Sequence, residues 1–269
     1  MNGIRAVSLC LVIAASTHAG AASKYQLTQD PQAVAVAQAA FTAMGGAQAV
    51  LSYQDSLASG TLTISAGGDP ISYPITMKSK GLRETRVELQ MPKGTNVRIV
   101  NQGQGVIIRP AGSVQVLDSI NTFYVHVNHV PILSLLSEYA NGTVNVIYQG
   151  VQIVNGQSEN VIEVDFVPNT DPVMAPIFAA KSRTLFFVNQ ITSLVDKIQS
   201  YPLDEGSAHS SVNEEIYFDS YQSVNGMLVP FHLVVFRDGS LYEDVKFSTV
   251  SLNVGLADSD FALPKAGGQ

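Results

Sequence analysis

Apolar residues recur at every second position through most of this chain, which is the spacing of β-strands that bury one face. Near the C-terminus, Phe231, Leu233 and Val235 share one face of such a strand, and His232 lies on the other. Glycine-containing turns such as residues 225–226 separate successive strands. This pattern predicts a large antiparallel sheet with one buried face.

The last predicted strand, residues 241–253, departs from strict alternation. Its apolar phase changes between Phe247 and Val250, which predicts a β-bulge near Ser248. The other strands are expected over residues 57–64, 71–77, 83–91, 96–101, 106–109, 143–148, 160–166, 185–188, 194–201 and 214–221.

A helix is expected after Asp30, whose carboxylate suits the N-cap, with Pro31 in the first turn. Gly45-Gly46 marks its end, and a second short helical turn is expected over residues 47–53. Helical spacing predicts that one side of the first helix is buried. The residues expected on that side are Val34, Ala37, Phe41 and Met44.

Two apolar segments interrupt the strands. Residues 130–139 are expected to form a helix that begins at Pro131, and its apolar stripe predicts that it covers an apolar surface. Residues 169–182 are expected to form an apolar loop or broken helix, and long connections of this kind often act as lids. The stripe of the first segment comprises Ile132, Leu135, Leu136 and Tyr139.

The N-terminus has the three-part plan of a secretory signal peptide over residues 1–21. The single cation Arg5 precedes a short apolar stretch, and small residues follow it. Cys10, the only cysteine, follows Leu9 rather than the small residue that a lipid-attachment motif needs. We therefore expect a periplasmic protein without a lipid anchor, a membrane-spanning segment or a disulfide, with residues 22–269 as a single domain.

Charge and composition narrow the class of ligand. The formal net charge of −7 is scattered along the chain without a basic patch, which excludes nucleic acid as a partner. Apolar residues make up 46% of the chain and charged residues 14%, which indicates that much surface is buried or covered by a ligand.

The sequence carries no recognised catalytic or metal-binding signature. It has no nucleotide-binding, nucleophile-elbow or zinc-protease motif, and no cofactor is expected. His126 and His129 are the only close histidine pair, and a strand would turn their rings to opposite faces, so we predict no metal site. Glu214 and Glu215 also diverge in a strand, which argues against general acid–base chemistry. We expect a binding protein, with an enzyme whose site is assembled from distant residues as the less favoured alternative.

The remaining candidate is an apolar cavity. A curved sheet with one apolar concave face, covered by helices, either packs solidly or leaves room for an acyl chain. The candidates for ligand binding are Leu133, Leu136, Phe186, Phe218, Phe231 and Leu233. The alternative is that these residues fill an ordinary core.

Several segments resemble, in the same order, the LolA-like superfamily of periplasmic lipoprotein carriers. They are Met77-Lys78-Ser79-Lys80-Gly81-Leu82-Arg83, Asn96-Val97-Arg98-Ile99-Val100-Asn101, Phe186-Phe187-Val188-Asn189, Val229-Pro230-Phe231 after Asn225-Gly226, and Asp260-Phe261 with Pro264. The resemblance spans residues 57–264 and implies an unclosed β-barrel around helices, with a hydrophobic cavity for the acyl chains of lipoproteins or related lipids. Arg86 falls in the family's arginine-bearing strand, but alternation with Val87 places it on the polar face, so no gating role is assigned to it.

Together these patterns predict an α+β fold, mainly antiparallel β, built as a half-barrel around a few helices. The expected function is a monomeric periplasmic carrier that holds a lipid or a lipoprotein acyl chain in an apolar cavity without covalent chemistry. The cargo stays open, because Asn101-Gln102-Gly103 replaces the family's Asp-Gly turn and the chain has no tryptophan. An envelope-sensing module of the same fold, which binds a protein partner, is the alternative function.

Overall fold

The computed structural model describes residues 25–65, 69–117, 122, 130–131, 144–167, 173–204 and 207–264. The helices are α1 (Pro31–Ala43), α2 (Gly46–Leu51), α5 (Ala175–Ser182) and the 3-10 helix η1 (Asp258–Phe261). The strands are β1 (Asp55–Ile64), β2 (Ile71–Lys80), β3 (Glu84–Met91), β4 (Gly94–Asn101), β5 (Gln104–Ile108), β6 (Val114–Val116), β7 (Val144–Val154), β8 (Gln157–Phe166), β9 (Thr184–Asn189), β10 (Val195–Ser200), β11 (Leu203–Asp204), β12 (Ser207–Ser211), β13 (Glu214–Val224), β14 (Met227–Arg237) and β15 (Ser240–Leu252).

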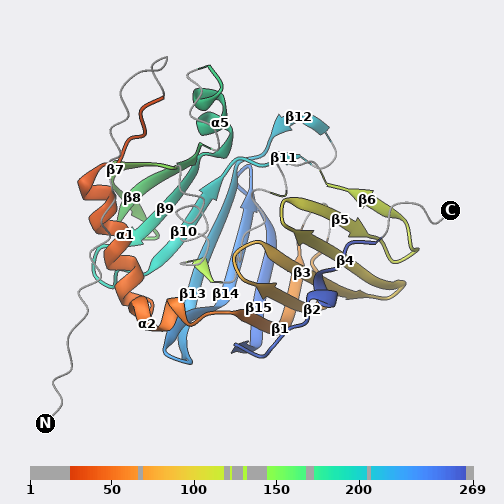
Figure 1. Cartoon of the computed structure of the whole chain (residues 1–269). Helices are drawn as coiled ribbons and strands as arrows, with labels where there is room; N and C mark the ends of the chain where they lie inside the picture. The colour runs from red at the N-terminus through yellow and green to blue at the C-terminus, as the bar shows by residue number, and fades with distance from the viewer. Residues whose placement is uncertain are drawn as a thin grey trace, which may run out of the picture.

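Thirteen strands of this described part form one sheet, in the order β6-β5-β4-β3-β2-β1-β15-β14-β13-β10-β9-β8-β7. Its strand pairs are antiparallel. The outermost strands β6 and β7 are not neighbours, so the sheet stays open. Figure 1 shows a curved layer with α1 and α2 along one face. This open, mainly antiparallel sheet with few helices confirms the predicted fold class.

Helix α1 begins where the sequence predicts, but its buried side is displaced. Asp30 is the N-cap, and its Oδ1 accepts a hydrogen bond from the backbone N–H of Gln32 at 2.8 Å. The predicted stripe is right for Ala37 and Met44, and Phe41 packs half-buried against the same core, whereas Val34 is half-buried and does not belong to that core. Small alanine side chains allow the helix to approach β7 and β8, and this decides which side is buried. The buried residues are Ala33, Ala37, Ala40 and Met44.

The predicted bulge in β15 is confirmed. The pairing of β1 with β15 shifts between Ser59 and Gly60, and Ser248 is the residue that it skips. Gly60 is required here for a steric reason, because a Cβ at this position would lie 2.0 Å from the carbonyl oxygen of Lys246. A bulge increases the local twist, which suits a strongly curved sheet.

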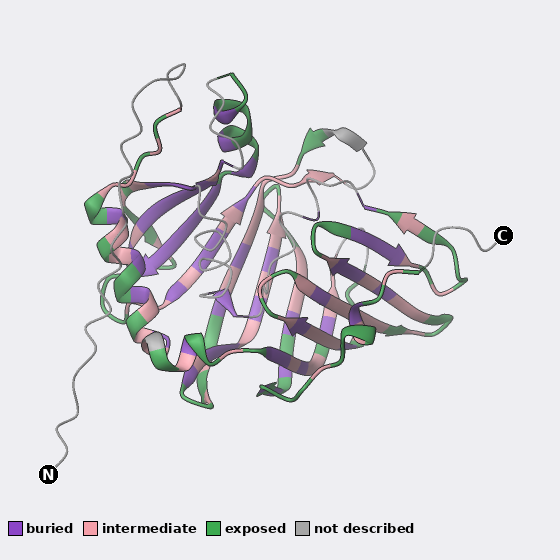
Figure 2. Ribbon diagram, viewed as in Figure 1, coloured by how far each residue is buried: buried purple, intermediate pink, exposed green. Residues whose placement is uncertain are grey.

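The two apolar segments between strands are described in part. Val130 is fully buried in the main core, whereas Leu133 and Leu136 lie outside the described residues. The predicted signal peptide and the close histidine pair also lie outside them. In the later segment, α5 packs against β8 and gives residues 175–182 the helical form that the sequence allowed. Figure 2 shows buried residues along the middle of the strands and exposed ones on the outward side of α5.

Candidate apolar binding face

The inner face is the side of the large sheet that packs toward α1 and α2, and rows of apolar side chains cross it from strand to strand. Phe186 on β9 lies opposite Ile198 on β10, which lies opposite Ile216 on β13. Further along, Phe218 on β13 lies opposite Leu233 on β14. Directly opposed residues are close enough to pack together, so the rows join into one apolar surface.

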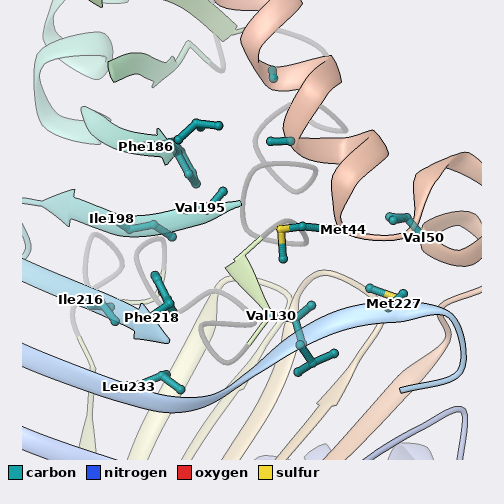
Figure 3. Packing of buried hydrophobic residues seen from close by; sticks show 14 of the residues in the cluster. Met44, Val50, Val130, Phe186, Val195, Ile198, Ile216, Phe218, Met227 and Leu233 are labelled. Atoms are coloured by element: carbon teal, nitrogen blue, oxygen red, sulfur yellow. The ribbon is translucent and has the colours of Figure 1, made fainter. Parts of the chain in front are cut away.

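The four described candidates all belong to this surface. Phe186 is fully buried, Phe218 and Leu233 are each 4% exposed, and Phe231 is half-buried at the same cluster. Figure 3 shows Phe186, Phe218 and Leu233 directed toward the space between the sheet and the end of α1, where Met44 also points. The inward phase that alternation predicts for Phe231 and Leu233 on β14 is therefore correct. Their burial suits a packed core as well as a ligand-lined face.

The helices cover the inner face unevenly. Helix α1 packs against β7 and β8, and α2 packs against β14. On β2 and β3, Met77, Val87 and Leu89 join the same cluster but are only half-buried. The apolar surface therefore continues into a region where it is accessible.

Arg98 places a cation in this accessible region, and the sequence prediction missed it. Arg98 on β4 lies opposite Val87 on β3, so both side chains rise from the inner face. Its Nε atom is shielded from solvent although the residue is only half-buried. The sequence does contain a signal for this position. Val97 and Ile99 flank Arg98 in β4, so the alternation of the strand places Arg98 on the opposite face from them. Arg86 lies on the outer face as predicted, and its guanidinium donates to a backbone carbonyl of η1 at 3.1 Å.

Two tyrosine hydroxyls lie at the margins of the inner face. The Tyr221 hydroxyl donates to the carbonyl oxygen of Val195 at 2.5 Å, and the Tyr53 hydroxyl lies 3.1 Å from the Ser56 hydroxyl. Burial raises the pKa of both tyrosines well above the ordinary value, so the phenols stay neutral. They therefore add neutral polar groups, not charges, to the apolar surface.

One histidine and two aspartates lie close together on the outer face. This arrangement bears on the alternative that the protein is an enzyme whose site is assembled from distant residues. On β14, His232 has Nδ1 2.8 Å from Asp219 and Nε2 3.1 Å from Asp244. The neighbouring hydroxyl of Ser220 donates to Asp219 at 2.6 Å and not to the imidazole. In a serine–histidine–aspartate triad the serine hydroxyl donates to the imidazole, and these three residues do not have that arrangement.

Other reactive groups are engaged in structural pairs. Glu214 pairs with Arg237 at 2.9 Å and Glu215 pairs with Lys197, so the two adjacent carboxylates diverge as predicted. Within the described ranges, no group of three or more His, Cys, Asp or Glu residues is arranged to hold a metal ion. No helix in those ranges is long and apolar enough to cross a membrane.

Comparisons with known proteins identify the fold. No family model matches the chain, and no curated protein sequence matches it. A DUF1329 family protein from Desulfovibrio piger superposes with a TM-score of 0.57 and 16% identity, over 87% of this chain and 98% of that chain. A LolA superfamily protein from Nitrosomonas europaea gives 0.56 and 11%, over 86% and 97%. A putative outer membrane lipoprotein-sorting protein domain from Vibrio parahaemolyticus gives 0.55 and 12%, over 85% and 95%. The chain therefore has a LolA-like fold, as its sequence motifs implied.

Proposed function

We propose that this protein is a periplasmic carrier that holds the acyl chain of a lipid or lipoprotein on its inner face. The observation that carries the proposal is the inner face itself, where apolar rows cross an open sheet and include the half-buried residues Met77, Val87 and Leu89 on β2 and β3. The LolA-like fold supports it by analogy, because one solved structure of this fold carries the name putative outer membrane lipoprotein-sorting protein domain. The proposal includes export by the predicted signal peptide, a monomeric state, and binding without a cofactor or a catalytic step.

The physical basis is the transfer of hydrocarbon from water to an apolar face. Each buried methylene contributes about 0.8 kcal/mol, so about eight methylenes contribute roughly 6 kcal/mol before the cost of ordering the chain. Such contacts have no fixed direction. Flexible side chains such as Met77 can adapt to chains of different length.

Arg98 gives the proposed site a polar end. A guanidinium beside an apolar face suits the acidic head of an amphipathic ligand, such as a carboxylate or phosphate. Arg86 is a matched control, because it lies on the neighbouring strand with the opposite phase. We expect Arg98→Met to weaken binding of a fluorescent fatty acid by about tenfold, since a charge-assisted hydrogen bond contributes about 1.5–3 kcal/mol. Arg86→Met should change the affinity by less than about twofold, and equal effects of the two variants would exclude Arg98 as the contact for the head group.

Native mass spectrometry of protein purified from its own periplasm tests the carrier function. We expect a bound adduct that lipid extraction identifies as acyl-containing. Two half-buried phenylalanines on β14 then test the face: Phe231 belongs to the inner cluster, whereas Phe236 packs on the outer face with its ring 5.6 Å from that of Tyr217. Phe231→Ala should weaken fatty-acid binding, and Phe236→Ala should leave it unchanged. Protein without an adduct, together with equal binding by both variants, would contradict the proposal.

A further inference from the structure

Helix α5 turns its small side chains toward the protein and its large apolar side chains toward solvent. Ala175, Ala179 and Ser182 are buried. Ile177 is 51% exposed, and Phe178 is exposed beside it. Helices on a protein surface usually bury their large apolar residues. The pattern of burial in α5 is therefore the reverse of the usual one.

The residues before the helix extend the same surface. Val173 is 72% exposed, and Met174, Pro176 and Ala180 are exposed as well. Every exposed residue from 173 to 180 is therefore apolar. Figures 1 and 2 show α5 at the periphery of the molecule with its outward side uncovered. A contiguous apolar patch of this kind marks an interaction surface.

Specific contacts hold α5 in this orientation. The Ser182 hydroxyl accepts a hydrogen bond from the backbone N–H of Phe166 at 2.8 Å. Ala175 and Ala179 belong to a small buried cluster against which Tyr25 packs. Turning the helix to bury its large side chains would break these contacts, so their exposure is built into the fold.

Two cations follow the apolar residues of this patch. They are Lys181 in the last turn of α5 and Arg183 directly after the helix. Arg183 pairs with Glu163 at 2.7 Å, and Lys181 is exposed in the last turn of α5. A cation beside an exposed apolar face adds about 1 kcal/mol to binding at the surface of an anionic membrane.

We propose that α5 docks the protein onto the surface of a bilayer that contains anionic lipids. Val173, Met174, Ile177 and Phe178 enter the boundary between head groups and acyl chains, and Lys181 stays at the level of the phosphates. A bilayer fits better than a protein partner, because the exposed side chains of residues 173–180 are all apolar, whereas protein interfaces carry about one hydrogen bond per 100–200 Å². This docking goes beyond the carrier function, since it does not depend on what the inner face holds.

Cosedimentation of the protein with lipid vesicles tests the docking. Wild type should bind vesicles of phosphatidylcholine with phosphatidylglycerol more strongly than phosphatidylcholine alone, and salt should weaken the difference. Replacing Ile177 and Phe178 together with serine should lower the partition coefficient by about tenfold or more, as expected for two large apolar side chains. Lys181→Glu should weaken binding to the anionic vesicles. Ile191→Ser is the control, because Ile191 is 84% exposed but lies in the turn between β9 and β10.

Folding and ligand binding are measured on the same variants. Circular dichroism and fatty-acid binding without vesicles should match wild type for the double serine variant, which separates docking from the carrier function. Failure of wild type to bind anionic vesicles, or equal binding by wild type and the double serine variant, would overturn the proposal. Self-association that requires Ile177 and Phe178, in protein that ignores vesicles, would overturn it in favour of a protein partner.

Discussion

The inner and outer faces of strands β8, β9 and β10 are both largely buried, but by different interactions. The inner face is covered by apolar contacts such as that of Phe186 with Ile198. On the outer face, the ammonium of Lys197 lies 4.4 Å from the centre of the Phe187 ring and pairs with Glu215. Apolar contacts have no fixed direction and can rearrange around a ligand, whereas ion pairs fix the positions of their partners. The two faces are therefore similar in burial but differ in chemistry, because the outer face combines apolar residues such as Leu185 with ion pairs.

Buried carboxyl groups sharpen this contrast. Glu159 on the outer face of β8 is fully buried, and Glu163 and Asp165 on the same side are nearly so. The Asn189 amide donates to Glu159 at 3.2 Å and to Asp196 at 2.9 Å. Burial and the neighbouring Asp196 raise the pKa of Glu159 to about 8, and burial also raises the pKa of Asp196. The outer face thus buries carboxyl groups beside its apolar residues, and Glu159 keeps its proton near neutral pH.

The largest effect in the comparison of the two faces is expected for substitutions of Phe186 and Phe187. They are adjacent, they point to opposite faces, and both are almost fully buried. Each change to alanine should lower the free energy of unfolding by about 3–5 kcal/mol, measured by denaturant titration. Only Phe186→Ala should also alter fatty-acid binding, under conditions where both variants are folded. An equal change in binding for Phe187→Ala would break the distinction between the faces.

The next effect is a dependence of stability on pH. Between pH 4.5 and about 8, folded protein keeps a proton on Glu159 that the unfolded chain releases. The contribution to stability is therefore complete below pH 4.5, declines as the pH rises through this window and is lost above about pH 8. Glu159→Gln should flatten this decline in urea titrations across the window. A variant with the same pH profile as wild type would show that Glu159 ionises normally.

The smallest effect is expected at His232. Its side chain is 22% exposed between Asp219 and Asp244, and pairs of this kind contribute at most about 1 kcal/mol. His232→Ala should lower the melting temperature slightly and leave fatty-acid binding unchanged. Severe loss of stability at His232 with no effect of Phe231→Ala would mean that the assigned faces of β14 are reversed.

The sequence was sufficient for features that depend on neighbouring positions. Alternation in β14 gives the inward phase of Phe231 and Leu233, and the phase change near Ser248 gives the bulge, because both are local consequences of the strand period. Asp30 likewise marks the start of α1 through a bond to a residue two positions away. Phe186 and Phe218, which were candidates for ligand binding, also lie on this inner face.

Features that depend on distant segments could not be predicted in this way. The partners of Glu159 come from β9 and β10, so its burial is not visible in the pattern of β8. The buried side of α1 depends on how closely alanines can approach β7, and the reversed pattern of burial in α5 depends on contacts with Phe166 and the N-terminal segment. The prediction that Leu133 and Leu136 line the site stays a prediction.

The contact at Gly60 determines which amino acids the chain tolerates there. Any side chain would meet the carbonyl oxygen of Lys246 in the neighbouring strand, whereas a Cβ at turn glycines such as Gly103 and Gly239 would meet nothing within 4 Å. Those turns need a left-handed backbone, which asparagine also adopts at modest cost. In a library of single substitutions, position 60 should therefore accept glycine alone, while the turn positions should retain asparagine variants. The β-bulge opposite Gly60 thus requires a residue without a Cβ atom.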